Sequence, residues 1–296
     1  MSVPDVNTVL VSVCIPTYNG AEYLSEALNS VKAQTFKEFE VVISDDASKD
    51  NTLEIVEDFK NSVDFPVTIF NHEPQGIGAN WNNCIRHAKG KYIKFLFQDD
   101  VLAPHCIEVM VNVLENNSKL GLVSCKRSFI VEPSYLNSTT KEWMQNFEDL
   151  QRGLEFSWDN GVMLLDKSLF KSPMFFKRPP NKIGEPSLYM FPKRVVNTIG
   201  YFREDLKQVL DYEFCYRLLK RQNIAILKEE LVSFRLHKMQ ATNINRTSEH
   251  DDYTIYNSLL EKDYLWYFSR QKQVAILRKR YPLFNYLFKI KRKIGL

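Results

Sequence analysis

The hydrophobic positions of residues 9–125 follow two alternating patterns. Continuous apolar runs such as Val9–Ile15 and Phe39–Ser44 are rich in β-branched residues and stop at polar turns. Between these two runs, Ala21–Gln34 places its leucines and valine at helical spacing. Continuous runs are typical of strands buried on both faces, and the wider spacing is typical of amphipathic helices. The alternation therefore predicts βα units that form a doubly wound, mostly parallel α/β sheet flanked by helices.

The same patterns give a predicted element for most of the chain. Strands are expected at Val9–Ile15, Phe39–Ser44, Pro66–Asn71, Tyr92–Phe97, Leu120–Ser124, Gly161–Leu165, Ser187–Phe191, Ile224–Leu227 and Leu231–Leu236. Helices are expected at Ala21–Gln34, Thr52–Lys60, Ala79–Lys89, Pro104–Asn116, Asp211–Arg221, Asp251–Phe268 and Gln271–Tyr281. Residues 126–160 have no clear period, so an irregular insertion is expected there. We divide the chain into a domain at 1–245 and a helical extension at 246–296.

The composition is that of an ordinary soluble protein. The chain has 296 residues, 44% of them hydrophobic and 25% charged, which allows one large or two small domains. Its five cysteines form no CxxC pair and are interpreted as buried free thiols in a reducing compartment. The N-terminus lacks the pattern of a signal peptide, and no apolar run is long enough to span a bilayer. These features predict a cytoplasmic protein.

Charge is unevenly distributed along the chain. No acidic residue follows Asp263, whereas the tail has nine basic residues, Arg270, Lys272, Arg278, Lys279, Arg280, Lys289, Lys291, Arg292 and Lys293. With a net charge of +3 overall, residues 1–263 carry −6. A basic, aromatic tail predicts an anionic surface as partner, such as the inner face of a membrane. The alternative is a helical pair that packs on the domain with its charges solvated. Nucleic acid is suggested by the tail alone and is not expected.

Three predicted strands end in groups suited to a ligand. They end in Pro16-Thr17-Tyr18, Asp45-Asp46 and Asp99-Asp100. The carboxyl ends of parallel strands lie at one edge of a sheet, where ligands of open α/β sheets bind. An aromatic ring can stack on a base, and carboxylates can bind a cation or ribose. No GxGxxG follows the first strand and no P-loop is present, which argues against dinucleotide and P-loop sites. The purely structural alternative is that Asp100 caps a helix and Asp99 is solvated.

Six motifs in order resemble those of family 2 glycosyltransferases of the GT-A fold. They are Val11–Gly20, Ser44–Thr52, Gly76–Gly90, Tyr92–Asp100, Asp211–Leu218 and Arg235–Thr242. The resemblance implies transfer of a sugar from a nucleotide donor with inversion at the anomeric carbon, usually with a divalent metal. It also implies roles for the residues that match each motif.

The implied donor site comprises residues from several motifs: Pro16, Thr17, Tyr18 and Asn19 beside the base, Asp45 reading it, Asp46 next to Asp45, Asn82, and Asp99 at the ribose. The implied metal ligands, for Mn²⁺ or Mg²⁺, are Asp99, Asp100 and His237. Asp211 matches the catalytic base. Two departures stand out: Phe97 replaces an acid found in many relatives, and Leu210 replaces the acid that often precedes the base.

Each assignment has a structural alternative. Asp211 is suited to an N-cap, Asp45 to capping the turn before Thr52, and His237 to an ordinary strand histidine. Tyr18 and Trp81 suit the core, because aromatic side chains are usually buried there. Glu213 is a rival base, but two positions along a helix it faces elsewhere. Glu185 is near the expected acceptor side, although a solvated loop acid is the simpler interpretation.

The hypothesis from the sequence is a metal-dependent, inverting glycosyltransferase. Its donor would be a UDP- or dTDP-sugar, and its acceptor a glycan or lipid-linked glycan in surface polysaccharide or O-antigen synthesis. It would work in the cytoplasm, peripherally at the inner membrane face. One alternative is a sugar-phosphate nucleotidyltransferase, but the sequence lacks the glycine-rich loop that such an enzyme needs after its first strand. Another is a non-catalytic nucleotide-sugar or glycan-binding module.

Overall fold

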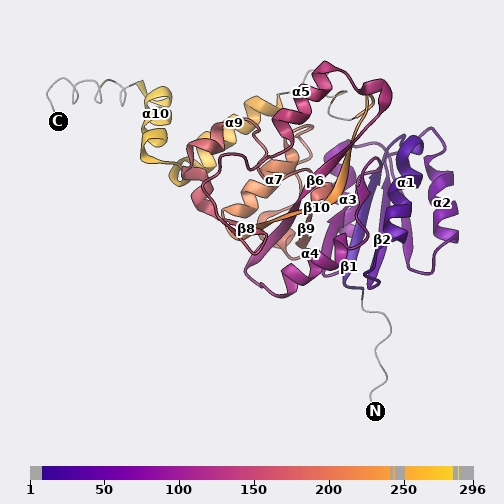
Figure 1. Cartoon of the computed structure of the whole chain (residues 1–296). Helices are drawn as coiled ribbons and strands as arrows, with labels where there is room; N and C mark the ends of the chain where they lie inside the picture. Colours follow the sequence, from indigo (N-terminus) through magenta and orange to yellow (C-terminus); the bar gives the residue numbers. More distant parts are fainter. Residues whose placement is uncertain (1–8, 241–242, 244–250, 283–285, 287–296) are drawn as a thin grey trace, which may run out of the picture.

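One mixed β-sheet forms the centre of the molecule (Figure 1). The structure is a computed structural model that describes residues 9–240, 243, 251–282 and 286. The strand order is β3-β2-β1-β4-β9-β6-β10-β8-β7, and β5 pairs with β10 outside this path. The predicted α/β class is confirmed, with parallel strands in the first half of the sheet and antiparallel additions in the second.

The parallel half comes from the first 95 residues. Strand β1 (Val11–Thr17) lies between β2 (Phe39–Asp45) and β4 (Tyr92–Phe95), parallel to both. Strand β3 (Val67–Asn71) extends this half beyond β2. Because all four run the same way, their carboxyl ends lie at one edge, as the sequence predicted.

The other half is built around two long strands. Strand β6 (Leu120–Val131) runs parallel to β10 (Asn223–Leu236). Strand β9 (Tyr189–Pro192) lies between β4 and β6, antiparallel to both, and joins the two halves. The short strands β5 (Val101–Leu102), β7 (Trp158–Asp159) and β8 (Val162–Leu165) complete the sheet.

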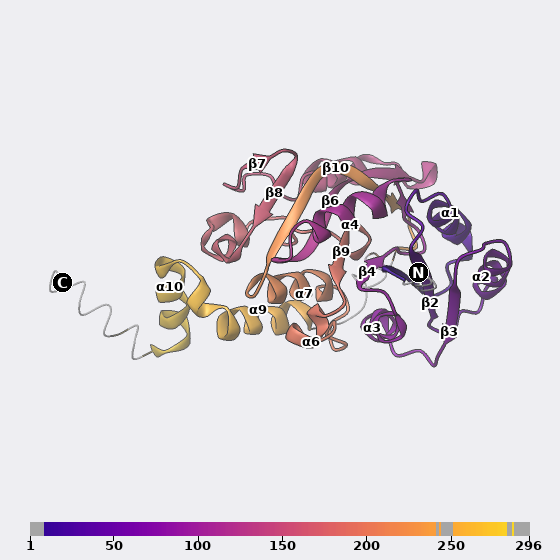
Figure 2. The same ribbon diagram turned by 90° about the horizontal axis from the view of Figure 1, so that it is seen from below.

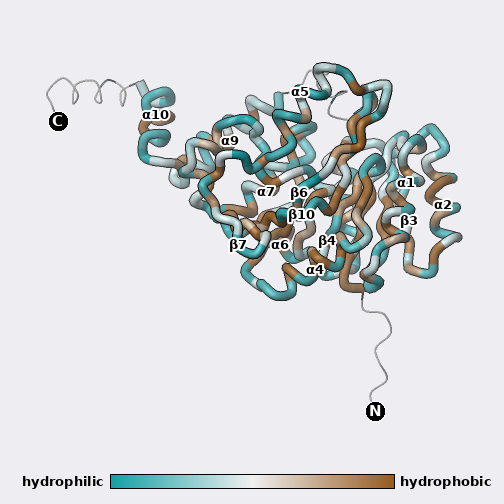
Figure 3. Tube along the Cα trace, viewed as in Figure 1, coloured by the Kyte–Doolittle hydropathy of each residue, from teal (hydrophilic) through white to brown (hydrophobic). Residues whose placement is uncertain are grey.

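Helices cover both faces of the sheet (Figure 2). One face packs against α1 (Ala21–Lys32), α2 (Thr52–Asn61) and α4 (Cys106–Glu115). The other packs against α3 (Ile77–His87), α6 (Val195–Ile199) and α7 (Leu210–Leu219). Apolar segments lie in the strands and inner helix faces, while hydrophilic segments lie outside (Figure 3). All five cysteines are buried free thiols, as predicted.

Two predictions about the second half were wrong. Residues 223–236 form one strand, not two, because bulges between Leu227 and Val232 keep the chain paired with β6. The predicted irregular insertion contains the second half of β6 and helix α5 (Ser138–Phe147). Asn137 caps α5 by accepting a hydrogen bond from Thr140 N at 3.0 Å, a short-range signal that the absence of periodicity obscured.

The C-terminal extension packs on the same core as the rest of the chain. It contains α9 (Asp252–Asp263), the 3₁₀ turn η5 (Leu265–Tyr267) and α10 (Arg270–Arg280), at the end of the molecule away from α1 and α2 (Figure 1). Tyr256, Tyr264 and Phe268 are buried in the cluster that contains α7. The boundary at 245/246 lies outside the described residues. Within the described ranges, no helix is long and apolar enough to cross a membrane.

Candidate functional site

The ends of β1 and β4 are joined by one glutamine that the sequence analysis did not single out. Gln98 Oε1 accepts the Tyr18 N–H at 2.9 Å, and Gln98 Nε2 donates to Tyr18 O at 3.1 Å. The Tyr18 side chain is not part of the core, since the residue is 54% exposed. Trp81, by contrast, is buried against Phe97 and Phe202, as the structural alternative had it. Tyr18 thus offers a free ring at the sheet edge.

Most other polar groups at the end of β1 hold the turn together. Asp45 is fully buried and accepts hydrogen bonds from Thr17 Oγ1 at 2.8 Å, Ser48 N at 2.8 Å and Ser48 Oγ at 2.6 Å. Asn19 Oδ1 accepts from Lys49 N at 2.7 Å. Pro16 is buried within β1. The carboxylate of Asp45, which the sequence predicts to read a base, is buried in this structure and caps the turn.

Asp46 is better placed than Asp45 to meet a ligand. Its Oδ1 accepts from Gln75 N at 3.2 Å and lies 3.6 Å from His72 Nδ1. The side chains of Asp46 and His72 are 11% and 20% exposed. The sequence did not single out His72, which directly follows β3 and so shares the carboxyl edge of the sheet.

The Asn82 side chain faces residues 202–204. Its Nδ2 donates to Phe202 O and to Glu204 Oε1, both at 2.9 Å, and its Oδ1 accepts from Phe202 N at 3.0 Å. The amide is buried and its hydrogen bonds are made within the protein. Asn82 anchors residues 202–204 to α3, so we do not include it in the donor site.

The acidic pair Asp99-Asp100 meets the end of β10. Asp99 Oδ2 lies 3.0 Å from His237 Nε2. Asp100 Oδ1 accepts from Arg235 N at 3.1 Å, while Asp100 Oδ2 is buried without a partner. Burial, and then the charge of Asp99, raises the pKa of Asp100 well above its ordinary value. Asp100 is therefore not a helix cap, since α4 begins at Cys106, and Asp99 is not simply solvated, since its carboxylate contacts His237.

His237 and Arg235 are fixed from several sides. The ring of Tyr23 contacts the His237 ring edge to face, with centroids 4.6 Å apart. His237 Nδ1 is buried without a partner. Arg235 Nε donates to Asp99 O at 2.9 Å, and its guanidinium also pairs with Glu26. His237 is thus not an isolated strand residue. Its Nε2 contacts Asp99 of the acidic pair, and its Nδ1 has no hydrogen-bond partner.

Asp211 lies in the first turn of α7 but does not cap that helix. The N-cap is Val209, without a side-chain hydrogen bond. Asp211 Oδ2 accepts from Asn181 Nδ2 at 2.8 Å, and Oδ1 is buried without a partner. Burial raises the pKa of Asp211 to about 7. The rival acid, Glu213, is buried and paired with Arg217 at 2.9 Å, so it is not free to act as a base.

Glu185 connects the acidic pair with Asp211. Its Oε2 accepts from Arg127 Nη1 at 2.9 Å, and its side chain is 23% exposed. Its charge raises the pKa of both Asp100 and Asp211, so all three carboxylates surround one region. The simpler interpretation of Glu185 as a solvated loop acid is wrong, because a buried arginine holds it there.

A divalent cation would find two carboxylates here. Among the described residues, no group of three or more His, Cys, Asp and Glu side chains is arranged to hold a metal. The unpartnered Asp100 Oδ2 and the adjacent Asp99 nevertheless fit the hard oxygen ligands that Mg²⁺ and Mn²⁺ take. Such ions are commonly held by one or two carboxylates together with substrate phosphates. The two carboxylates therefore fit a metal ion whose remaining ligands come from a bound diphosphate.

The sequence decides the family. The sequence model of Glycosyl transferase family 2 matches residues 12–176, more than half of the chain. The chain belongs to this family. The match contains the two acidic pairs and ends before Asn181, Asp211 and His237. An uncharacterized glycosyltransferase of Rickettsia typhi is 30% identical to this family 2 chain over 258 residues, which cover 87% of this chain and 70% of that protein.

Solved glycosyltransferases have the same fold as this family 2 chain. Staphylococcus aureus TarS (residues 1–349) in complex with UDP-GlcNAc aligns with a TM-score of 0.63 and 22% identity, covering 90% of this chain and 70% of that one. The chain spans 42% of a longer TarS structure. The mannosyltransferase PcManGT of Pyrobaculum calidifontis, in complex with GDP-Man and Mn²⁺, aligns with a TM-score of 0.57 and 16% identity, covering 96% and 80%. The fold is thus the predicted GT-A fold.

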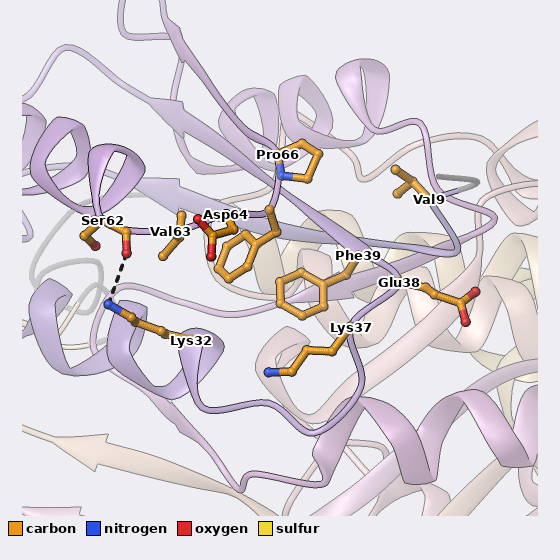
Figure 4. Close-up of a pocket in the computed structure, with 10 residues that line it drawn as sticks. Val9, Lys32, Lys37, Glu38, Phe39, Ser62, Val63, Asp64 and Pro66 are labelled. Carbon is orange, nitrogen blue, oxygen red and sulfur yellow. Dashed lines mark hydrogen bonds between the residues drawn. The ribbon is translucent and has the colours of Figure 1, made fainter. Parts of the chain in front are cut away.

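One hollow lies away from all of these residues. It has a volume of about 700 Å³ and is lined by residues around the starts of β1, β2 and β3, among them Lys32, Phe39 and Pro66 (Figure 4). These residues precede the strands, whereas the site residues follow them. The hollow therefore lies at the opposite edge of the sheet from the candidate site.

Proposed function

We propose that this family 2 protein transfers a sugar from a nucleotide-diphosphate donor to a hydroxyl group, with inversion at the anomeric carbon. One observation carries the proposal. A half-buried carboxylate, Asp211, has one oxygen held and the other unpartnered, in the region that also contains Asp99 and Asp100. Such a transfer needs a base whose pKa lies near the working pH. It also needs an anionic edge that holds the cation bound to the diphosphate.

The donor would bind along the carboxyl edge of the sheet. The exposed Tyr18 ring offers a face for the base, and Asp46 offers a carboxylate to its N–H groups. Asp99 and Asp100 would hold Mn²⁺ or Mg²⁺, which would neutralise the charge of the leaving diphosphate. A UDP- or dTDP-sugar is the donor we favour. The TarS complex with UDP-GlcNAc and the PcManGT complex with GDP-Man and Mn²⁺ support a nucleotide sugar and a metal.

The chemistry of this chain's own residues centres on Asp211. The ionised Oδ1 would accept the proton of the acceptor hydroxyl as its oxygen attacks the anomeric carbon. One base is sufficient for a direct displacement, whereas hydrolysis of a glycoside needs an acid and a base on opposite sides of the bond. Glu185, held by Arg127, is close enough to this base and to Asp100 for its charge to raise the pKa of both.

The decisive experiment changes Asp211 to Asn. We expect transfer to fall at least about 10²-fold, because a positioned base contributes roughly 10²–10⁴, while donor binding is retained. Transfer is followed with labelled nucleotide sugars, and binding by the rise in melting temperature with and without Mn²⁺. Undiminished sugar transfer by Asp211→Asn would contradict the assignment of Asp211 as the base. Donor binding without any transfer by the unmodified chain favours the binding module.

We also propose that the acceptor is a glycan or lipid-linked glycan at the inner membrane face, in surface polysaccharide or O-antigen synthesis. Trp266 is 75% exposed and Tyr281 is 48% exposed beside the basic helix α10. Exposed aromatic side chains next to basic ones suit an anionic lipid surface. Part of this charge is already used, since Lys279 pairs with Glu261 at 3.0 Å.

Co-sedimentation with lipid vesicles tests the membrane contact. We expect binding to phosphatidylglycerol vesicles at low salt, weaker binding to phosphatidylcholine vesicles, and a further loss in Trp266→Ala. Equal sedimentation with both lipids contradicts the preference for an anionic surface. No sedimentation with either contradicts the membrane contact and leaves the packed helical pair as the explanation of the tail.

A further inference from the structure

Asn181 begins the segment that leads into β9, and its side chain is fully used. Oδ1 accepts the backbone N–H groups of Ile183 and Gly184, both at 2.9 Å. Nδ2 donates to Gly184 O at 3.0 Å and to Asp211 Oδ2 at 2.8 Å. A single amide group therefore closes a tight turn and joins that turn to the first turn of α7.

The turn itself is anchored to α7 on both sides of Asn181. The Tyr216 hydroxyl donates to Pro180 O at 2.6 Å and accepts the Lys182 N–H at 2.9 Å. Tyr216 is buried in the core. Because residues 180 and 182 are tied to the same helix as Asp211, the Asn181 amide has little freedom to move away from the carboxylate.

The contact leaves Asp211 with one oxygen fixed and one free. With Oδ2 held by Asn181, rotation of the carboxyl group about its Cβ–Cγ bond would break this hydrogen bond and leave a buried polar group unpaired, which is unfavourable. The unpartnered Oδ1 therefore points in one fixed direction. A base must be held within about 3 Å of the proton that it takes.

We propose that Asn181 is a positioning residue of the glycosyl transfer: its amide fixes the Asp211 carboxyl group so that Oδ1 faces the acceptor hydroxyl. The inference rests on the proposed function, in which Asp211 is the base. Among the described residues, Asn181 makes hydrogen bonds to the base and to a turn of its own segment, and none to the acidic pair. Its effect should therefore fall on the proton transfer and not on donor affinity.

The hydrogen bond also affects the ionisation of the base. Burial raises the pKa of Asp211, whereas the backbone N–H groups of Tyr212 and Asp211 and the bond from Asn181 lower it. The ionisable groups that interact with Asp211 from the surrounding elements are Glu185, Tyr189, Tyr212, Cys215 and Tyr216. None of these described groups is a cation, so the Asn181 amide is the side chain that favours the ionised carboxylate.

Two substitutions separate the base contact from the turn. Asn181→Asp keeps an oxygen that can accept from Ile183 and Gly184, but it replaces the donor to Asp211 with a second acceptor. Asn181→Ala removes both. Asn117→Ala is the matched control, because Asn117 Oδ1 likewise accepts a backbone N–H two residues on, from Lys119 at 3.2 Å, in the exposed turn before β6.

The first measurement needs no substrate. In protein labelled with ¹³C-aspartate, the carboxyl resonance of Asp211 is identified by its absence in Asp211→Asn and is titrated with pH. We expect its midpoint near 7 in the unmodified chain and at a pH higher by about 1 in Asn181→Asp, because a like charge disfavours ionisation. Asn181→Ala should move the midpoint in the same direction, and Asn117→Ala should leave it unchanged.

The second measurement is the pH profile of sugar transfer from UDP-N-acetylglucosamine with Mn²⁺. In Asn181→Asp the acid limb should move upward with the Asp211 midpoint, so that kcat on that limb falls about tenfold if the midpoint rises by about 1 in pH. The KM for the donor should change less than about twofold, as expected when only a transition-state interaction is lost. Asn117→Ala should retain both values.

The outcomes distinguish this inference from the proposed function. An unchanged Asp211 midpoint in Asn181→Asp, or an equal loss of rate at every pH, overturns the positioning role and leaves Asn181 as a structural turn residue. Undiminished transfer by Asp211→Asn overturns the base itself. The Asp211 titration still reports on the Asn181 contact in that case, because it does not depend on turnover.

Discussion

At the scale of single residues, the candidate site contains three of the seven buried side-chain atoms that lack a hydrogen-bond partner in the described part of the chain. Asp100 Oδ2, His237 Nδ1 and Asp211 Oδ1 are all buried without a hydrogen bond. Buried polar atoms are nearly always paired in native proteins, so three such atoms around one region are unusual. Each is a group that a cation, a phosphate or a hydroxyl can satisfy. A bound substrate is therefore expected to complete hydrogen bonding that the chain alone leaves open.

The raised pKa of Asp211 predicts a gain in stability from Asp211→Asn above neutral pH. The folded value of about 7 exceeds the unfolded value of roughly 4, so the folded state binds this proton more tightly. The stabilisation is complete below about pH 4 and is lost as pH rises through 7. The uncharged variant avoids this loss, and we expect it to be more stable by roughly 2 kcal/mol at about pH 8.

Urea unfolding at about pH 5 and about pH 8 checks this. The difference between the two proteins should be larger at the higher pH. A variant that is less stable than the unmodified chain at the higher pH would show that the ionised carboxylate is well solvated in the fold.

Asp45 and Asp46 are neighbours with opposite expected effects. Asp45→Asn disturbs three hydrogen bonds of a fully buried carboxylate, so we expect a loss of about 2–4 kcal/mol in the free energy of unfolding. Asp46→Asn should change stability by less than about 1 kcal/mol but weaken nucleotide binding. Urea unfolding measures the stability of each variant, and calorimetric titration with UDP measures its nucleotide binding. Weaker UDP binding in Asp45→Asn than in Asp46→Asn would show that Asp45 contacts the base.

The sequence predicted the residue types of the site better than their individual tasks. Asp99, Asp100, His237 and Asp211 were found because they stand at strand or helix ends in family motifs. The proposed exchange of tasks between Asp45 and Asp46 rests on the hydrogen bonds of Thr17 and Ser48 to the Asp45 carboxylate, which no local pattern reveals. Asn181, Gln98 and Arg127 were not assigned roles, because their partners are 30 or more positions away in the chain.

At the scale of elements, the predicted strands and helices of the first 125 residues agree with the structure to within a few residues. There, hydrophobic periodicity and burial coincide, since each strand is covered on both faces. The prediction failed in residues 126–160 and at residues 223–236, where β6 and β10 continue beyond the layered part of the sheet. Outside that layer, side chains of one strand meet different surroundings, and the period is lost.

The turn between α3 and β4 depends on the absence of a side chain at Gly90. A Cβ atom there would lie 2.6 Å from Ser12 N and 2.7 Å from Val11 C, both backbone atoms of β1. Because a strand backbone cannot yield easily, we expect Gly90→Ala to cost about 2–4 kcal/mol of stability.

Gly161→Ala is the matched control for this prediction. Gly161 has a φ of +78° but nothing within 4 Å of the added carbon, so its cost should be limited to about 1 kcal/mol of backbone strain. Thermal unfolding of both variants measures the difference. Equal losses would show that the close approach of Gly90 to β1 is relieved by movement.

At the scale of the whole molecule, the C-terminal extension and the α/β domain form one folding unit in the described part of the chain. Tyr264 is buried, with its ring centroid 5.3 Å from that of Phe170. Trp266, two residues on, is 75% exposed. We expect Tyr264→Ala to lower the stability of the whole protein by about 3–5 kcal/mol and Trp266→Ala to change it by less than about 0.5 kcal/mol.

A single cooperative transition in both variants is the expected result of calorimetry. A separate, low-temperature transition in Tyr264→Ala would contradict the single unit and identify the extension as an independent domain. Trp266→Ala thus serves two purposes: it is the stability control here and the sensitive variant for vesicle binding.

Strand β9 sets the distance between the two ends of the reaction. It is the one strand of the described sheet that touches both β4 and β6, with Lys94 opposite Met190 and Ser124 opposite Tyr189. The segment carrying Asn181 and Glu185 enters the sheet through it. A slip of two residues in this pairing keeps every side chain on its own face yet moves that segment by roughly 7 Å along β4. The spacing between the acidic pair Asp99-Asp100 and Asp211 is therefore encoded in the register of a short strand.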